Sequence, residues 1–203
     1  MEFQRFIRKH LPGLKILPVS TTRVIPGAII DPHRMQVFGH CREVLPDEPE
    51  ETWAYAYSEA SMIYGTITAN RKLRSGARVM GIFSLGGSYG KDMNVHIEIN
   101  DIRGAILKTS QLALQPMVNE LRSIDRRGRW RLINNKLVVL ETFYASGFTA
   151  TFFRQEQMVT QAELEEITRI DIDASVDYQW TTGQQLVITN NDSVPFGVRG
   201  FVV

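Results

Sequence analysis

The sequence of 203 residues contains a single cysteine, Cys41, and no long apolar run. One cysteine excludes a disulfide framework and favours a reducing compartment such as the cytoplasm. The apolar runs span only a few residues, as at 137–140, whereas a transmembrane helix needs about 20. Residues 1–13 also lack the apolar core of a secretory signal. If the chain enters a membrane, we expect it to do so as β-structure or by lying on the membrane surface.

Net charge is nearly absent too, at +1, but the charges are unevenly distributed. Residues 1–42 hold seven Lys and Arg against two acids, and residues 122–131 hold five arginines against one acid. Residues 43–51 hold five acids and no base, and residues 156–177 hold seven acids against one arginine. Such blocks are typical of binding faces or of solvated loops. The composition, with 43% hydrophobic and 22% charged residues, predicts one domain of residues 1–203 with a packed core.

Apolar periodicity predicts an α+β fold, with a twisted, mainly antiparallel sheet and flanking helices. Residues 2–11 have helical spacing, with large apolar side chains on one face and basic side chains on the others. Residues 109–126 also suggest a helix, and since Pro116 fits best in a first turn, we expect that helix to begin near Gln115. Its expected buried stripe is Leu114, Val118, Leu121 and Ile124.

Four long segments are strand-like, at residues 53–68, 79–99 (broken by the glycine loop at 86–90), 137–154 and 167–180. They exceed the usual strand of about 5–6 residues, and each is long enough for a tilted transmembrane strand of about 9–11. They would form two long hairpins able to become transmembrane β-strands. A half-buried antiparallel sheet in an ordinary soluble protein has the same alternation, so this pattern alone leaves both interpretations open. Shorter strands at 186–189 and 198–203 are expected to close the fold.

No segment indicates a credible enzyme site. Residues 86–90 match the G-x-S-x-G nucleophile elbow, but an alternating strand follows them where that motif needs a helix. Only His96 follows the serine, eight residues later, so a flexible hairpin loop is the better interpretation. The Gly-Lys pair at the end of this loop suggests a phosphate-binding motif, whose pattern fails at Leu85 and Asp92. We therefore expect neither catalysis nor a cofactor.

Two other groupings have simpler interpretations than a reactive site. Asp171, Asp173 and Asp177 share a strand face and carry oxygen ligands suited to Ca²⁺ or Mg²⁺, but a solvated face explains them without a metal. His40 and Cys41 are adjacent, yet neighbours on a strand point to opposite sides, so no thiolate–imidazole pair is expected. We predict no metal site.

The arginines within residues 122–131 surround Trp130 and leave three interpretations open. They could bind nucleic acid, bind a phospholipid headgroup, or simply be solvated at a helix end. No recognised nucleic-acid motif surrounds them, so nucleic acid is not an expected partner.

Several features in chain order carry a resemblance to a known family. They are the basic N-terminal helix, a long hairpin rich in small residues, an arginine-containing helix and four motifs: Leu17-Pro18-Val19-Ser20, Glu98-Ile99-Asn100-Asp101, Asn135-Lys136-Leu137-Val138-Val139-Leu140-Glu141-Thr142 and Val194-Pro195-Phe196-Gly197-Val198-Arg199-Gly200-Phe201. Each motif is short, and their order and spacing over nearly the whole chain carry the argument. The chain resembles the pore-forming domain of the gasdermins, in a compact bacterial or fungal form.

The resemblance implies a domain that binds acidic lipids of the inner leaflet, assembles as a homo-oligomer and inserts β-hairpins as a large β-barrel, with cell lysis in immune or antiphage defence. It also implies a cytoplasmic inactive form and an active form at the cell membrane. Family members are normally held inactive by a C-terminal domain or peptide. Since residues 1–203 include no separate inhibitory domain, we expect an activating protease or a regulatory partner. Cys41 does not match the acylated N-terminal cysteine of compact bacterial members.

The resemblance also assigns residues to roles. The lipid-binding residues would be Arg5, Arg8, Lys9, Arg71, Lys72, Arg74 and Arg78. The membrane-inserting strands, in hairpins at 53–99 and 137–180, would present Tyr55, Tyr57, Ile63, Phe83, Val95, Ile97, Val138, Leu140, Tyr144, Phe148, Ile170, Ile172, Val176 and Tyr178. The pore lumen would carry Glu141, Asp171, Asp173 and Asp177. The competing interpretation is a soluble lipid- or protein-binding module of an immunity system, which stays monomeric.

Overall fold

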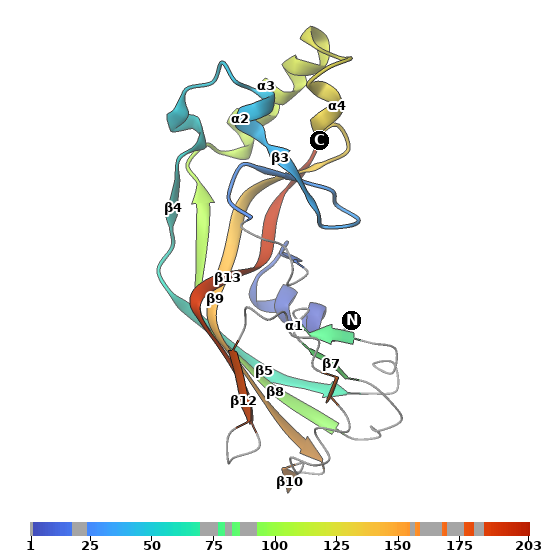
Figure 1. The fold of residues 1–203 in the computed structure, drawn as a ribbon, viewed down its shortest axis with the longest axis vertical. Helices are drawn as coiled ribbons and strands as arrows, with labels where there is room; N and C mark the ends of the chain where they lie inside the picture. Colours follow the sequence, from blue (N-terminus) through green and yellow to red (C-terminus); the bar gives the residue numbers. More distant parts are fainter. Residues whose placement is uncertain are drawn as a thin grey trace. The chain divides into compact units, whose positions relative to one another are not determined.

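A computed structural model describes residues 2–17, 24–69, 77–79, 83–85, 93–154, 157–158, 168–169, 177–180 and 185–203. The described residues form the expected α+β fold, with long antiparallel strands and few helices (Figure 1). The chain divides into two compact units. Unit 1 comprises Met1–Ser20, Ala60–Ile102 and Ala145–Val194, and unit 2 comprises Thr21–Glu59, Arg103–Tyr144 and Pro195–Val203.

The described elements follow one another along the chain in this order: α1 (Glu2–His10), β1 (Lys15–Ile16), β2 (Ala28–Ile30), β3 (Val37–His40), α2 (Cys41–Val44), the 3-10 helix η1 (Glu50–Trp53), β4 (Tyr55–Tyr57), β5 (Ser61–Ala69), β6 (Ala77–Val79), β7 (Phe83–Leu85), β8 (Met93–Leu107), α3 (Gln111–Ile124), α4 (Trp130–Ile133), β9 (Leu137–Arg154), β10 (Gln157–Met158), β11 (Thr168–Arg169), β12 (Asp177–Trp180) and β13 (Gln185–Val202). Ten strands pair in one sheet, and β11, β7 and β6 pair in a second. Every pair with a described register is antiparallel.

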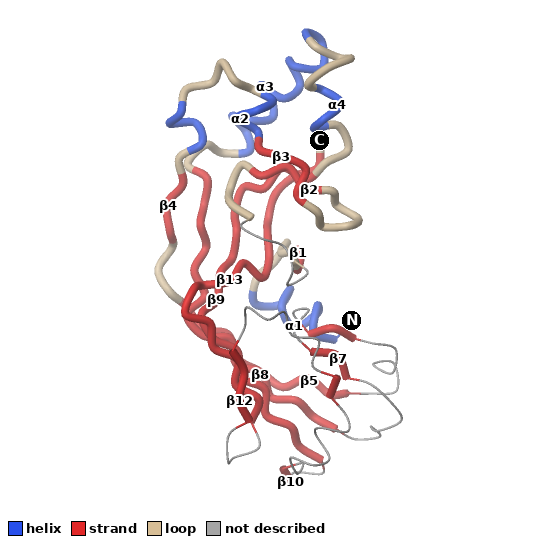
Figure 2. Tube along the Cα trace, viewed as in Figure 1, coloured by secondary structure: helices blue, strands red, loops and turns tan. Residues whose placement is uncertain are grey.

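In unit 1, β5 pairs with β8 from Ser61 opposite Ile102 to Ala69 opposite Met93. The alternation predicted for β8 is confirmed, because Val95, Ile97 and Ile99 are buried. Helix α1 packs against β5 (Figure 2). The same period that a membrane strand would need therefore builds an ordinary covered sheet face in this state.

In unit 2, helices α2, α3 and α4 lie together near the end of β13 (Figure 1). One buried cluster joins them to the strands, and its members are Ile29, Cys41, Val44, Trp53, Leu107, Leu114, Val118, Leu121, Ile133, Val138 and Phe201. Gly200 of β13 is required by this packing. A Cβ atom there would overlap the carbonyl oxygen of Val138, which is backbone and has no rotamer by which to move away.

The strand expected at 53–68 is interrupted, so that prediction is wrong in its middle. Trp53 ends η1, and residues 58–60 separate β4 from β5. The backbone N–H of Ser58 donates to the Gly104 carbonyl at 2.8 Å, while its Oγ accepts from the Gly104 N–H at 2.8 Å. The Ser58 hydroxyl thus accepts the hydrogen bond that a backbone carbonyl would accept in a regular strand pair. The alternation of apolar and polar residues does not predict such a side-chain bond, so the interruption was not foreseen.

Helix α3 begins at Gln111 and not near Gln115 as expected. Ser110 caps it, since its Oγ accepts from the Ala113 N–H at 3.4 Å. Pro116 therefore lies inside the helix, where it removes one backbone hydrogen bond. Three residues of the predicted stripe, Leu114, Val118 and Leu121, are buried. The fourth, Ile124, is 68% exposed, so its predicted burial is wrong.

The two closing strands expected at 186–189 and 198–203 are one continuous strand, β13. The polar residues 190–193 and Pro195 have low strand propensity, which suggested a break. Pairing with neighbouring strands overrides that local preference, because β13 lies between β1 and β9 in the sheet order.

Candidate membrane-interaction surfaces

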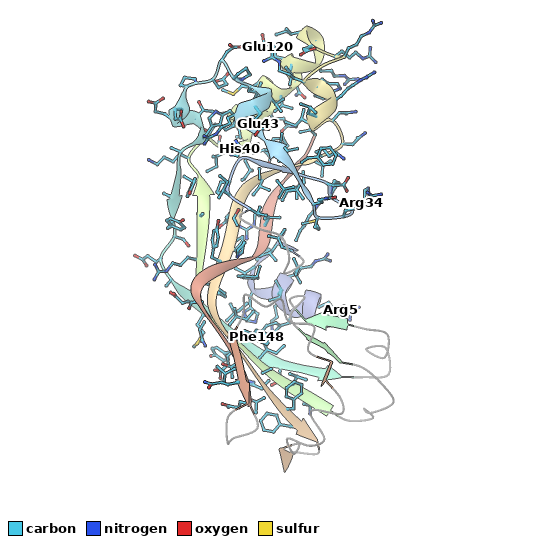
Figure 3. All side chains as sticks on the ribbon, in the orientation of Figure 1. Arg5, Arg34, His40, Glu43, Glu120 and Phe148 are labelled. Atoms are coloured by element: carbon cyan, nitrogen blue, oxygen red, sulfur yellow. The ribbon has the colours of Figure 1, made fainter. Side chains whose placement is uncertain are left out.

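Helix α1 carries the first predicted lipid-binding group. Ile7 is completely buried, whereas Arg5, Arg8 and Lys9 are exposed, as the helical spacing predicted. Figure 3 shows Arg5 on this helix. The Leu11 N–H donates to the Ile7 carbonyl at 2.7 Å, and the chain then turns away from the helix. Two of these cations lie in the last turn, where they complement the helix dipole.

A close contact positions α1 on the sheet of unit 1. A Cβ atom on Gly65 of β5 would lie 2.5 Å from Cε2 of Phe6, so the glycine makes room for the ring. The Phe6 and His10 rings are neighbours along the helix, with centroids 5.0 Å apart and planes tilted by 58°. Because the apolar side of α1 is held against β5, its basic side is left toward solvent.

The remaining predicted lipid contacts are not tested by the structure. Arg71, Lys72 and Arg74 lie outside the described residues. Arg78 lies in β6 opposite Ser84 of β7, and only its backbone is described. Their grouping with α1 stays a prediction.

The predicted membrane-inserting residues occupy different environments. The buried ones are Ile63, Val95, Ile97, Val138 and Phe148. Leu140 and Tyr144 are half-buried, and Tyr55 and Tyr57 are exposed on β4. Phe83 and Tyr178 lie in β7 and β12 with only their backbones described, and Ile170, Ile172 and Val176 lie outside the described residues. Most of the described set therefore forms core in this state.

The one predicted lumen acid with a described side chain, Glu141, is ion-paired. Arg199 Nη1 lies 2.6 Å from Glu141 Oε2, and the Arg199 guanidinium lies 5.0 Å from the centre of the Phe143 ring. Asp171 and Asp173 lie outside the described residues, and Asp177 begins β12 with only its backbone described. Within unit 2 the Glu141–Arg199 ion pair therefore links β9 to β13.

The expectation that His40 and Cys41 are neighbours on one strand is wrong, because Cys41 begins helix α2. His40 ends β3 and precedes α2; its Nδ1 accepts from the Arg42 N–H at 3.1 Å, and its Nε2 lies 3.0 Å from the Pro26 carbonyl oxygen. Both ring nitrogens are thus engaged, and burial lowers the pKa of His40. Burial raises the pKa of the Cys41 thiol to about 12, so the thiol stays protonated.

The glycine loop at 86–90 and the Lys91 that follows it lie outside the described residues. Among the side chains that are described, no three His, Cys, Asp or Glu residues come together as metal ligands. No helix within the described ranges is both long enough and apolar enough to span a bilayer.

The arginine segment folds into a pocket that its sequence did not predict. Arg122, Arg126, Arg127 and Arg131 line it, whereas Arg129 turns to Asp125 with Nε 3.3 Å from Oδ2. The other lining residues are Trp130, Asn119, Asn134, Asn135 and Val203. Val203 is distant in sequence from the arginines, so only the folded chain brings these groups together.

Comparison with known proteins identifies the fold. A scan against models of protein families finds no match, and a search of curated proteins finds none. The chain is similar to the structure of a bacterial gasdermin from Bradyrhizobium tropiciagri, with a TM-score of 0.53 and 11% sequence identity. The similarity covers 97% of this chain and 84% of that chain. The fold is therefore gasdermin-like, which confirms the resemblance noted in the sequence motifs.

Proposed function

We propose that this protein forms pores in membranes that contain acidic lipids. The observation that carries the proposal is the gasdermin-like fold over 97% of the chain. The exposed cations of α1 support it, because each Lys or Arg near an anionic surface contributes about 1 kcal/mol of attraction. In this proposal the protein is cytoplasmic while inactive and acts at the cell membrane as a homo-oligomer.

The long strands supply the membrane-crossing structure in this proposal. Strands β8 and β9 contain 15 and 18 residues, more than the roughly 9–11 that cross a bilayer. Buried side chains such as Ile97 and Phe148 would exchange protein contacts for lipid contacts. An open sheet edge is unfavourable in lipid, so insertion requires a closed ring of subunits. The predicted lumen acids would then face water and disfavour anionic cargo.

Dye release from liposomes tests the proposal directly. Vesicles of phosphatidylcholine with phosphatidylserine should leak with the unmodified chain, and vesicles of phosphatidylcholine alone should not. Replacing Arg5, Arg8 and Lys9 with Glu should raise the protein concentration for half-release by about 100-fold or more, from about 1 kcal/mol per lost cation. Leakage unchanged by this variant would refute the assignment of α1.

A matched charge reversal at exposed positions of unit 2 serves as the control. Arg34, Arg42 and Lys108 are exposed, and replacing them with Glu makes the same change in net charge. We expect this variant to leak like the unmodified chain. If the unmodified chain stays monomeric on acidic vesicles and releases no dye, the soluble binding module replaces the pore-former as the better interpretation.

A further inference from the structure

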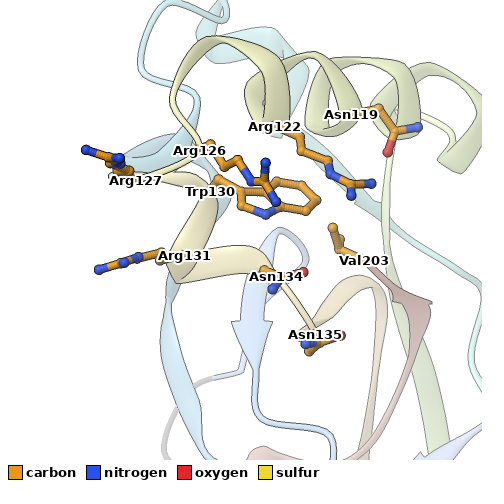
Figure 4. A pocket seen from close by; sticks show the side chains of 9 residues that line it. All are labelled: Asn119, Arg122, Arg126, Arg127, Trp130, Arg131, Asn134, Asn135 and Val203. Atoms are coloured by element: carbon orange, nitrogen blue, oxygen red, sulfur yellow. The ribbon is translucent and has the colours of Figure 1, made fainter.

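The arginine-lined pocket of unit 2 has the dimensions of a small-molecule site. Its volume is about 790 Å³, within the range of roughly 300–1,000 Å³ typical of ligand pockets. Helix α3 contributes Asn119 and Arg122, and the turn to α4 contributes Arg126 and Arg127. Figure 4 shows the arginines around Trp130 of α4.

The pocket concentrates positive charge without a compensating acid side chain. Four arginines line it, and no Asp or Glu is among its described lining residues. The acid of this segment, Asp125, is already used: it accepts from the N–H groups of Gly128 at 2.9 Å and Arg129 at 3.1 Å and pairs with the Arg129 guanidinium. A guanidinium remains charged at any physiological pH, so the four charges persist.

Part of the lining is fixed before any ligand arrives. The Arg122 guanidinium carbon lies 5.8 Å from the centre of the Trp130 ring, within the range of a cation–π contact. Helices α3 and α4 are held by buried Leu121 and Ile133, and the Asp125 turn fixes the chain between them. In Figure 4 Arg126 also points toward Trp130, whereas Arg127 and Arg131 extend outward.

We propose that this pocket binds a ligand that carries two or more phosphate groups. Guanidinium groups match phosphate oxygens in pairs of parallel hydrogen bonds, and a monovalent anion would leave most of the four charges unbalanced. The side-chain amides of Asn119, Asn134 and Asn135 can donate to and accept from hydroxyl or ester oxygens between phosphates. A concave site of this volume fits a compact polyphosphorylated molecule better than an extended nucleic-acid strand.

The same phosphate chemistry occurs in soluble metabolites and in polyphosphorylated lipid headgroups. The proposal does not depend on pore formation, because it concerns binding by unit 2 alone. The two proposals can therefore fail independently. If the chain releases no dye, the pocket can still bind a phosphorylated ligand, and if the pocket binds none, the chain can still form pores.

Tripolyphosphate is the first probe, titrated into the full chain with calorimetry in 50 mM and in 200 mM salt. We expect saturable binding of one molecule per chain, weakened at least tenfold at the higher salt because the contacts are ionic. Replacing Arg122 and Arg126 with Gln should weaken binding at least tenfold. The matched control, Arg34→Gln with Arg42→Gln, removes two exposed arginines outside the pocket and should change affinity less than twofold.

Two further measurements are needed. One tests whether a loss of binding reflects unfolding, and the other tests whether the ligand is a lipid headgroup or a soluble molecule. Arg126→Gln alone removes one exposed side chain, should keep the melting temperature, and should still weaken binding at least threefold. Vesicles of phosphatidylcholine with phosphatidylinositol bisphosphate form the lipid arm: capture that tripolyphosphate competes away identifies a headgroup, and binding of tripolyphosphate alone identifies a soluble ligand. No saturable binding at millimolar tripolyphosphate in 50 mM salt, or an equal loss in the pocket and control pairs, would overturn the proposal.

Discussion

Helix α1 and the α3–α4 segment both gather arginines, but they present them in opposite ways. On α1 the cations stand on the side away from buried Ile7 and form a convex surface. Around Trp130 the cations line a hollow together with amide side chains. A convex row of charges suits a surface of many weak anionic sites, such as a lipid bilayer. A hollow suits one compact anion that several charges contact at once.

This difference shows why a count of charges predicts so little about function. Both segments are basic in sequence, and neither spacing alone separates surface attraction from ligand enclosure. The distinction comes from what lies behind the charges. Gly65 of β5 lets α1 lie close to the sheet while Arg5, Arg8 and Lys9 stay exposed. The turn at Asp125 instead lets Arg122 and Arg126 line a pocket beside Trp130, with Arg127 and Arg131 extending outward from it.

The largest expected effect comes from truncating a buried apolar side chain beneath α1 or within the α3–α4 segment. Ile7→Ala in α1 and Leu114→Ala in α3 each remove a side chain that is at most 1% exposed, and each should lower the free energy of unfolding by about 2–5 kcal/mol. We expect Ile7→Ala to weaken vesicle binding while tripolyphosphate binding persists, and Leu114→Ala to do the reverse. Chemical denaturation and both binding assays measure this. Parallel loss of both ligands in both variants would remove the functional distinction.

A smaller effect is expected from filling the contact behind α1. In Gly65→Ala the new Cβ would lie 2.5 Å from the Phe6 ring, so the ring or the helix must shift. Overpacking of this kind costs about 1–3 kcal/mol, and hydrogen exchange should show faster opening of α1. Met62→Ala, at an exposed position of the same strand, is the control and should change the exchange rates little. Unchanged protection of α1 in Gly65→Ala would argue against this anchoring contact.

Single-charge variants sharpen the comparison further. Arg8→Gln should weaken binding to phosphatidylserine vesicles about fivefold, the equivalent of about 1 kcal/mol. Arg127→Gln should change that binding less than twofold, since phosphatidylserine carries one phosphate and the pocket is proposed to select two or more. Vesicle co-sedimentation at constant ionic strength compares the two. Equal losses would mean that the bilayer senses net charge and not the geometry of α1.

The smallest expected effect concerns pH. The pKa of Asp125 is lowered, first because its carboxylate accepts from the Arg129 N–H, and also through the Arg129 side chain and the Gly128 N–H. Its stabilising contribution is therefore complete above the ordinary carboxyl pKa of about 4 and is lost as pH falls through the lowered folded-state value. Asp125→Asn should lower the melting temperature at pH 6 and converge with the unmodified chain near pH 2. A constant difference across that range would assign the effect to packing.

Local periodicity predicted the elements whose burial follows a simple repeat. Strand β9 has the expected bounds of 137–154, and α1 has its expected faces. Helix α2 was missed because a histidine precedes it: His40 accepts from the Arg42 N–H, and the His40 N–H donates to Glu43 Oε2 at 3.4 Å. Histidine is not among the usual capping residues, so sequence offers little signal there.

The two candidate sites also differ in how far the sequence alone predicts them. The exposure of Arg8 and Lys9 follows from helical spacing, so the sequence was sufficient to predict it. The pocket depends on Asn119, Asn134 and Val203 meeting the arginines, and that meeting depends on how α4 and β13 pack. Long-range packing of this kind leaves no periodic signal in a single sequence, which is why the segment left three interpretations open.

The buried thiol of Cys41 makes the protein suited to site-specific labelling without first replacing the native cysteine. Because burial raises the pKa of this thiol to about 12 and shields it from solvent, maleimide reagents should react with it very slowly while the fold is intact. Because it is the only cysteine, a second one placed at exposed Tyr64 would carry a fluorophore alone. A dye there can report on strand β5 as vesicles are added, and late reaction of Cys41 would time the opening of unit 2.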